Sequence, residues 1–211
     1  MIVAFDTYYY EGYSYTVGGV FESWSSSEVS YYVTSKRNCI DAEYKSGELY
    51  KRELPCIMQC LSLLNLETID TIIVDGYAWL SDDGKELVKG LGARLYDNIK
   101  MVYGVDKEIV GIAKNPYHVK IPNCFEVRHG VESEKPLFVT CSNADYAEYY
   151  SVLVGRMDGE YRIPTILKNV DTKSRELGHT DEVKETKPIE IDFGSFDELV
   201  AENEKRGFRV L

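Results

Sequence analysis

The sequence predicts one α/β domain built on a mixed β-sheet, with a small appendage at its C-terminal end. Three strand-like segments lead the chain, at residues 2–6, 13–21 and 29–34. Helix-like and strand-like segments then alternate from about residue 49 onward. The 211 residues, 44% of them hydrophobic, are enough to form one large core. Leading strands followed by alternating helices and strands indicate a mixed sheet covered by helices.

The first three strands are short apolar runs separated by turn residues. The opening run, Ile2-Val3-Ala4-Phe5, ends at Asp6, as a strand does when it leads into a turn. A Ser-rich turn at residues 24–27 separates the second strand from the third. Because these segments follow one another closely, we expect them to form an antiparallel meander.

The elements after the meander follow from the period of their apolar residues. Between residues 49 and 64, leucine, isoleucine and methionine recur at spacings of three and four, as they do on one face of a helix. Three leucines spaced by four predict a second helix over about 84–99. The other expected elements are strands at 71–75 and 108–113, a pair of strands at 124–127 and 136–140, a helix at 146–154, and a helix that begins at Ile163-Pro164 and runs through Asp171.

The composition divides the chain into a large domain and a small end. Residues 1–177 form the predicted domain, and the polar residues 178–188 form a predicted linker. Residues 189–211 then predict a strand followed by a helix. Ser195-Phe196-Asp197-Glu198 has the spacing of a capping box, and Gly207 suits the end of that helix.

The sequence has no segment that predicts a membrane anchor. No apolar run approaches the ~20 residues that a membrane-spanning helix needs, and no basic and apolar leader opens the chain. We therefore expect a cytoplasmic protein that works as a monomer and has no membrane partner.

Neither the cysteines nor the histidines form a pattern that predicts a catalytic or metal-binding site. The five cysteines form an odd set without CxxC spacing, which argues against a disulfide framework and against a structural zinc site. The three histidines are scattered, and none lies in a nucleophile motif with serine or cysteine. Acidic residues are the remaining candidates to carry any catalysis.

The net charge of −11 does not by itself exclude a nucleic-acid partner. Proteins that bind the phosphates of nucleic acid usually carry a stripe of basic residues on their surface. The acidic balance of this chain gives no reason to expect such a stripe. A site that gathers carboxylates to hold divalent cations nevertheless adds negative charge that the bound metal offsets. Nucleic acid therefore stays open as a partner.

Four acidic residues come from four separate elements and could converge. Asp6 and Asp75 both end apolar strands, and the carboxyl ends of neighbouring parallel strands meet at one crevice. Glu53 lies on a predicted helix, and Asp171 lies one turn after Leu167 on another. Such an oxygen-only set suits Mg²⁺ or Mn²⁺. Taken singly, the two strand-end aspartates are also typical turn formers, and the two helix acids are typical solvated charges.

The order and context of these residues resemble the endonuclease V family, nucleases that cut nucleic acid near deaminated purines. The residues from Tyr44 to Pro55 are similar to the family's Y-I-P-G-x-L-x-F-R-E-x-P segment, with the tyrosine, the glycine, one leucine and the final R-E-x-P in register. Further matches are the opening strand through Asp6, the V-D-G at 74–76, I-V-G-I-A-K at 109–114 and Y-R-I-P at 161–164.

The resemblance implies a ribonuclease H-like fold, a mixed sheet flanked by helices, and a metal-dependent site. Asp6, Glu53 and Asp75 would hold Mg²⁺, with Mn²⁺ as a substitute, and Asp171 would join them or orient the attacking water. Lys114 would face the cleaved phosphate, where an ammonium can offset developing charge.

The resemblance also implies a set of residues that contact the substrate, DNA or RNA. Tyr44 would act as a wedge beside the target base, because an aromatic ring can replace lost stacking. Gly47 and Gly76 would let the backbone approach a flipped base closely. Leu49 matches the leucine of the same segment, and Asn143 stands where the family has a histidine.

Several of the substrate-contacting positions differ from the family pattern, whereas the acids do not. Lys45-Ser46 replace Ile-Pro beside the wedge, and Arg94 replaces a helix histidine.

Three hypotheses about function follow from these matches and departures. The first is a Mg²⁺-dependent endonuclease acting near inosine in DNA or RNA, the second is a weakly active or inactive nucleic-acid-binding module of the same fold, and the third is a ribonuclease H-like nuclease that recognises structure rather than inosine.

Overall fold

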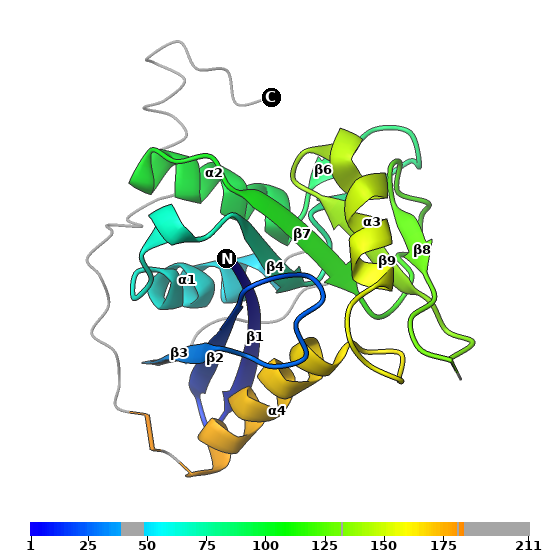
Figure 1. Cartoon of the computed structure of the whole chain (residues 1–211). Coiled ribbons are helices and arrows are strands. Elements are labelled where there is room, and N and C mark those ends of the chain that lie inside the picture. Colours follow the sequence, from blue (N-terminus) through cyan, green and yellow to red (C-terminus); the bar gives the residue numbers. More distant parts are fainter. Residues whose placement is uncertain (39–48, 132, 181, 184–211) are drawn as a thin grey trace, which may run out of the picture.

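The computed structural model describes residues 1–38, 49–131, 133–180 and 182–183 of the chain. Its main feature is a seven-stranded sheet in the order β3-β2-β1-β4-β7-β9-β8, with helices on both faces (Figure 1). The strands of this sheet are β1 (Ile2–Tyr10), β2 (Tyr13–Phe21), β3 (Tyr31–Asn38), β4 (Thr71–Asp75), β7 (Glu108–Ala113), β8 (Phe125–Val127) and β9 (Leu137–Cys141). The helices are α1 (Leu49–Leu61), α2 (Leu91–Tyr103), α3 (Ala147–Gly155) and α4 (Thr165–Thr180), with short 3₁₀ turns η1 (Leu66–Thr68) and η2 (Ala144–Tyr146).

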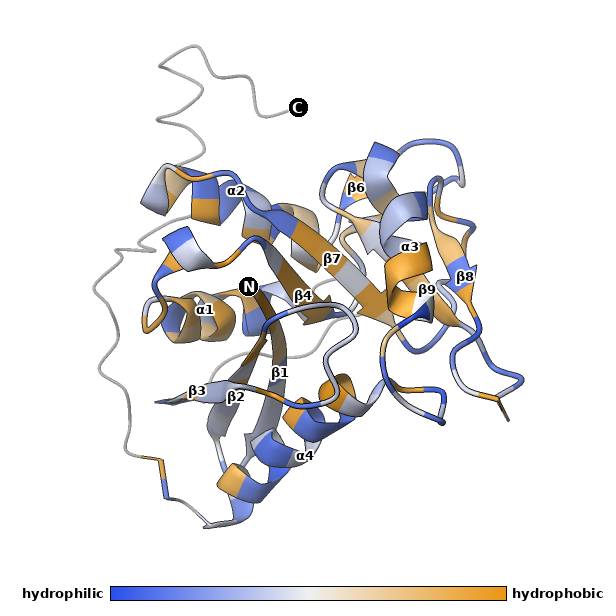
Figure 2. Cartoon of the chain, viewed as in Figure 1, coloured by the Kyte–Doolittle hydropathy of each residue, from blue (hydrophilic) through white to orange (hydrophobic). Residues whose placement is uncertain are grey.

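The sheet is mixed, as the sequence predicts. Strands β1, β4 and β7 are parallel neighbours, whereas β2 and β3 on one side and β9 and β8 on the other are antiparallel. Strands β4 and β7, in the centre of the sheet, are largely hydrophobic along their length (Figure 2). Strands that are covered by helices on both faces read as continuous apolar runs, which explains why the segments at 71–75 and 108–113 could be assigned from the sequence alone.

Each face of the sheet has its own hydrophobic core. Helices α1 and α2 cover one face, where Met58, Leu61 and Leu95 are fully buried. Helices α3 and α4 cover the other face, and Val154 and Ile166 are buried there. Because side chains alternate along a strand, each central strand contributes to both cores.

The N-terminal meander is antiparallel as predicted, but its first strand is longer than the sequence indicated. Strand β1 continues through Asp6 to Tyr10, because β2 pairs with it along its whole length. The connection is a two-residue turn in which Glu11 and Gly12 have φ of 48° and 80°. Such turns favour tight hairpins because their twist matches that of the strands. Asp6 therefore lies where β1 leaves the parallel sheet, not at the end of a strand.

The second helix begins later than predicted, at Leu91 instead of residue 84. The Asp83 carboxylate accepts two backbone N–H groups, and Gly84 adopts a φ of 77°, so this segment forms a turn. Residues 88–89, strand β6 (Val88–Lys89), then pair with β5 (Trp79–Leu80) in a small second sheet. The helix ends at Tyr103, and the next residue, Gly104, has the left-handed conformation that is typical of a helix C-cap.

Strand β3 (Tyr31–Asn38) begins two residues later and ends four residues later than predicted, whereas the remaining elements lie close to their predicted places. Helix α1 ends three residues before the expected limit, β8 pairs with β9, and α3 lies within one residue of prediction. Helix α4 extends to Thr180, so the first residues of the expected linker are helical. Most of that linker and the appendage at 189–211 lie outside the described residues. Within the described part of the chain, no helix is long and apolar enough to cross a membrane.

The backbone that follows β4 passes close to Gly111 of β7, where a side chain would collide with it. A Cβ at this position would lie 2.5 Å from the Ala78 amide nitrogen and 2.6 Å from the Gly76 carbonyl oxygen. We expect Gly111→Ala to cost about 2–3 kcal/mol in free energy of unfolding, because backbone atoms must move. Urea denaturation measures this loss. Gly155→Ala at the end of α3 is the matched control, since its Cβ would meet only a side chain at 3.4 Å.

Candidate active site

The strand register brings Asp6 and Asp75 to neighbouring positions. Phe5 of β1 pairs with Val74 of the parallel strand β4, so the next residue of each strand is an aspartate at the same level. Phe5 and Val74 point into the core under α1 and α2. Their successors therefore point to the opposite face, toward α4.

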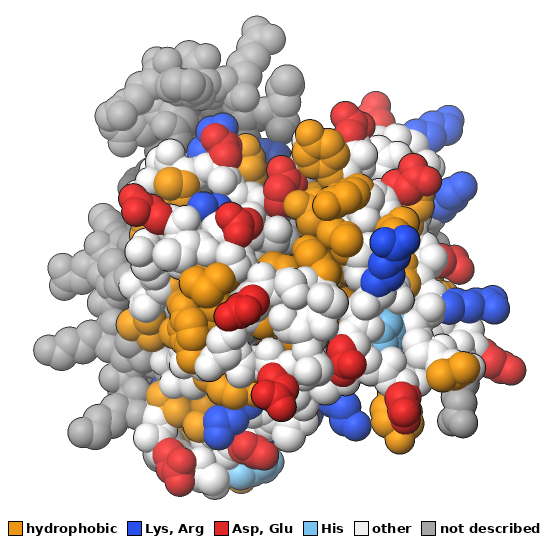
Figure 3. Space-filling model, in the orientation of Figure 1, with side chains coloured by type: hydrophobic (Ala, Val, Ile, Leu, Met, Phe, Trp, Pro, Cys, Tyr) orange, Lys and Arg blue, Asp and Glu red, His pale blue; other side chains and the backbone are white. Residues whose placement is uncertain are grey.

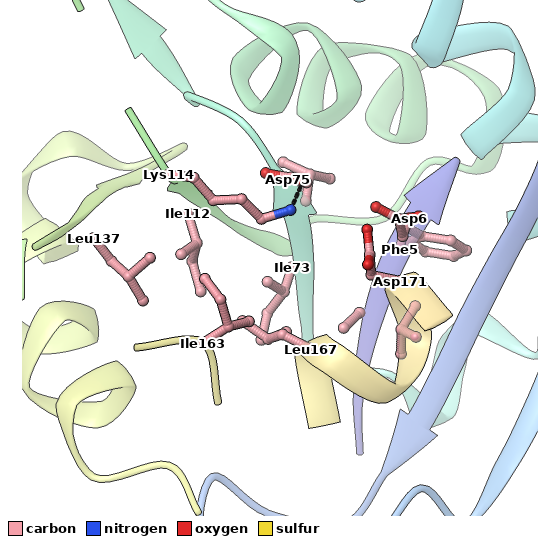
Figure 4. Close-up of a pocket in the computed structure, with 13 residues that line it drawn as sticks. Phe5, Asp6, Ile73, Asp75, Ile112, Lys114, Leu137, Ile163, Leu167 and Asp171 are labelled. Atoms are coloured by element: carbon pink, nitrogen blue, oxygen red, sulfur yellow. Dashed lines mark hydrogen bonds and ion pairs between the residues drawn. The ribbon is translucent and has the colours of Figure 1, made fainter. Parts of the chain in front are cut away.

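Two helices complete an acidic cleft at the carboxyl ends of the parallel strands. Glu53 comes from α1 and Asp171 from α4, and both line the same cleft as the two aspartates of the strands. Figure 4 shows Asp6 and Asp171 facing one another, with Asp75 beside Lys114. The cleft is lined by Phe5, Asp6, Thr7, Tyr8, Glu53, Ile57, Asp75, Lys114, Asp171 and Arg175. The four acids that the sequence singled out therefore converge from four elements.

Three of the acids have close polar partners. The Lys114 ammonium, at the end of β7, lies 2.6 Å from a carboxylate oxygen of Asp75. The Ser174 hydroxyl donates a hydrogen bond to Asp6. The Arg175 guanidinium donates to both carboxylate oxygens of Asp171, at 3.1 and 3.2 Å.

Burial and mutual repulsion disfavour negative charge in the cleft. Burial, together with the charges of Asp75 and Asp6, raises the pKa of Glu53 to about 8. Burial is also the main cause that raises the pKa of Asp6, and the hydrogen bond from Ser174 opposes it. Burial alone would lower the pKa of Lys114, but the neighbouring carboxylates outweigh it and raise that pKa. The cleft holds more negative charge than it can neutralise easily.

The donor set of the cleft fits a hard divalent cation. All four acids offer carboxylate oxygens, the ligand type that Mg²⁺ and Mn²⁺ prefer, and a bound cation would offset the repulsion that raises the pKa of Glu53. Among the described residues, no three acidic, histidine or cysteine side chains are already arranged around one point as a metal site. The ion pairs with Lys114 and Arg175 would have to loosen to expose Asp75 and Asp171.

An apolar pocket lies directly below the carboxylates. Ile73 and Ile112 of the sheet, together with Leu137, face Ile163 and Leu167 across it (Figure 4). These side chains anchor the start of α4 to the sheet, so that Asp171, one turn after Leu167, is carried to the cleft. The packing of α4 thus positions the fourth acid.

Three of the predicted substrate contacts, Tyr44, Gly47 and Leu49, belong to the segment of sequence that leads up to α1 and opens it. Tyr44 and Gly47 lie outside the described residues, so their predicted roles stay predictions. Leu49 is the first residue of α1, and the structure describes its backbone but not its side chain.

Gly76 and Asn143 have clear structural roles. Gly76 follows Asp75 directly and has a φ of 143°, a conformation that favours glycine. Asn143 caps η2 by accepting the backbone N–H of Asp145. Since β9 is antiparallel to β7, its C-terminal end lies at the other end of the sheet, and the structure does not bring Asn143 to the acids.

Three residues that the sequence analysis did not single out also line the cleft or bind its acidic residues. Ser174 and Arg175 follow Asp171 by three and four residues, a spacing that places them on the same side of α4. Tyr8 follows Asp6 by two residues and lies on the same face of β1. These spacings are visible in the sequence, but they acquire meaning only when the acids are known to converge.

Arg162 holds the strand end that carries Lys114. Its guanidinium donates to the carbonyl oxygens of Lys114 and of Pro136, the latter at 2.8 Å. We expect Arg162→Ala to lower the free energy of unfolding by about 1.5–3 kcal/mol, the cost of losing hydrogen bonds from a charged donor. Chemical denaturation tests this, with Arg156→Ala, an exposed arginine after α3, as the control. Equal stability of the two variants would contradict this role.

The fold and the cleft together define an α/β protein of ribonuclease H-like architecture with an acidic site at the carboxyl end of its parallel strands. Solved structures agree with this class. Endonuclease V from Bacillus subtilis matches with a TM-score of 0.60 and 22% identity, over 86% of this chain and 81% of that one. Human ENDOV matches with a TM-score of 0.58 and 19% identity, over 85% of this chain and 84% of that one.

A third solved structure, a protein of unknown function from Archaeoglobus fulgidus, matches with a TM-score of 0.50 and 11% identity, over 83% of this chain and 96% of that one. No protein-family model and no curated protein matches the sequence. The endonuclease V-like, ribonuclease H-like fold expected from the motifs is therefore confirmed at the level of structure.

Proposed function

We propose that the protein is a metal-dependent endonuclease that hydrolyses a phosphodiester bond near a deaminated purine in DNA or RNA. The observation that carries this proposal is the convergence of Asp6, Glu53, Asp75 and Asp171 on one cleft that also contains Lys114. The likeness of the fold to endonuclease V supports it. The choice of inosine as the target rests on the sequence resemblance.

The acids of the cleft would hold Mg²⁺, or Mn²⁺ in its place. Asp6 and Asp75 would be the central ligands, because they come from neighbouring strands of the rigid sheet. Glu53 and Asp171 would approach from the two sides, on helices packed against opposite faces. When bound, the metal supplies an activated water and polarises the phosphoryl oxygen.

Lys114 has a role of its own in this proposal. Its ammonium now neutralises Asp75, at a distance of 2.6 Å. With Asp75 engaged as a metal ligand, the Lys114 ammonium would be free to contact the phosphate, where negative charge develops during cleavage. The hydrogen bond from Arg162 to the Lys114 carbonyl fixes the backbone from which this side chain extends.

A panel of labelled oligonucleotides tests the proposal. The full-length protein is incubated with Mg²⁺ or Mn²⁺ and with DNA or RNA strands that contain inosine, a mismatch, an abasic site or a branch. We expect a single cut close to inosine and little cutting of the matched strand that carries adenosine or guanosine.

The other outcomes of the panel separate the alternatives. Cutting that follows the mismatch or the branch, and not the inosine, would favour a structure-selective nuclease. Binding without cutting under either metal would favour an inactive binding module. Neither binding nor cutting of any strand would contradict the proposal as a whole.

A further inference from the structure

The β1–β2 hairpin carries aromatic rings past the acidic cleft. Beyond Asp6, strand β1 leaves β4 and continues to Tyr10 as the partner of β2. Tyr8 and Tyr10 lie on the same face of the strand as Asp6, because side chains alternate. Tyr8 lines the cleft itself, so the row of rings begins at the acids and leads away from them.

The end of α4 adds further groups to this row. The rings of Tyr8 and Tyr10 are nearly parallel, with centroids 6.2 Å apart and planes at 13°. The His179 ring meets the edge of Tyr10 at 4.9 Å, and the Arg175 guanidinium lies 5.3 Å from the centre of the Tyr8 ring. We call Tyr8, Tyr10, Arg175 and His179 the hairpin platform. Arg175 also binds Asp171, which joins the platform to the cleft.

A hollow at the tip of the hairpin contains a second guanidinium group, that of Arg52. It is lined by Tyr9, Tyr10, Glu11, Gly12, Tyr13 and Arg52. The Arg52 guanidinium lies 3.8 Å from the centre of the Tyr9 ring. Arg52 precedes Glu53 in α1, so this hollow and the acidic cleft are bordered by adjacent residues of one helix.

Burial in the core accounts for some tyrosines of the hairpin but not for Tyr10. Tyr15 is 3% exposed and belongs to the core under α4. Tyr13 packs against the same core, and the Lys36 ammonium lies 4.3 Å from its ring centre. Tyr10, at the tip, is 37% exposed, and its ring is not needed to fill the core.

We propose that the hairpin platform binds unpaired nucleotides next to the phosphodiester that lies in the acidic cleft. Aromatic rings and guanidinium groups stack on any base whose face is free, and a single strand offers such faces whereas a duplex does not. The proposal relies on the proposed function only for the placing of that phosphodiester.

The overall charge makes such stacking more important in this protein. The chain carries a net charge of −11, and acidic side chains are scattered over the face seen in Figure 3. Long-range attraction of phosphates, which dominates binding in basic proteins, therefore contributes less. Contacts of bases with rings depend less on net charge, so they are the means by which an acidic protein can hold a strand close to its carboxylates.

The test compares three variants of the full-length protein by fluorescence anisotropy with a labelled single-stranded oligonucleotide in EDTA, which prevents cutting. Tyr10→Leu removes the ring, Tyr10→Phe keeps it, and Tyr146→Leu removes a 51% exposed tyrosine at the other end of the sheet. We expect Tyr10→Leu to weaken binding by at least about fivefold, the lower end of the effect of losing one stacked base. Tyr10→Phe and Tyr146→Leu should bind as the wild type does.

The outcomes separate this inference from the proposed function. Equal binding of the single strand by Tyr10→Leu and wild type would overturn it, even if the wild type cuts inosine strands. A loss of binding that is equally large for a blunt duplex would also overturn it, because the platform would then not be selective for free bases. Selective loss for the single strand would support it, even if no strand in the cutting panel is cleaved.

Discussion

Replacement of Asp75 with asparagine should lower the rate of strand cutting at least about a thousandfold while leaving the fold intact. Asparagine has nearly the same shape as aspartate, but it removes the charge that a divalent cation needs at the centre of the acidic cleft. Asp75 lies at the end of β4, where strand pairing fixes its backbone to β7. The fold should therefore survive, and circular dichroism together with single-turnover cutting assays measures the two effects separately.

The control for this substitution is Asp97→Asn on α2. Asp97 forms an ion pair with Lys89 at 2.8 Å, close in length to the pair between Asp75 and Lys114 at 2.6 Å. Loss of an aspartate–lysine pair is thus common to both variants, and only one of them lies in the cleft. Cutting by Asp97→Asn at the wild-type rate, beside a silent Asp75→Asn, assigns the effect to the cleft. Full cutting by Asp75→Asn would contradict the metal assignment.

The sequence predicted the central strands well because their burial leaves a simple pattern. Strands β4 and β7 are apolar on both faces, so their limits could be read from composition. The start of α2 was predicted too early. Three leucines at helical spacing suggested a helix from residue 84, but the turn that Asp83 stabilises lies at that point, and the helix begins only at Leu91. The length of β1 was missed because pairing with β2, a tertiary property, keeps Tyr8 and Tyr10 extended.

The acidic residues of the candidate site could be predicted from the sequence, but the packing that brings them together could not. The four acids could be chosen from their order along the chain, and the structure brings all four to one cleft. Their partners could not, because the contact of Ser174 with Asp6 joins α4 to β1 across most of the chain. Asn143 was proposed as a substrate contact because it stands where the family has a histidine, but the antiparallel direction of β9 carries it to the other end of the sheet.

The high pKa of Glu53 has a consequence for the stability of the metal-free protein. In the unfolded chain this carboxyl has a pKa of 4.5, and in the folded protein burial and its acidic neighbours raise it to about 8. Below the lower value the group is neutral in both states. As the pH rises from about 5 to about 8 the unfolded chain releases a proton that the folded protein retains, so the free energy of unfolding falls.

We therefore expect Glu53→Gln to be more stable than the wild type at about pH 8 in EDTA, by about 1–3 kcal/mol, and to lose most of this advantage near pH 5. Thermal unfolding followed by circular dichroism measures the difference. Glu67→Gln, at an exposed position in η1, removes the same charge without relieving the cleft and should follow the wild type. Saturating Mg²⁺ or Mn²⁺ should stabilise the wild type at pH 8 more than it stabilises Glu53→Gln, because the substitution removes one of the carboxylates whose repulsion the cation offsets. A wild type whose stability is constant over this pH range would show that Glu53 is not held neutral by burial and by the charges of Asp75 and Asp6.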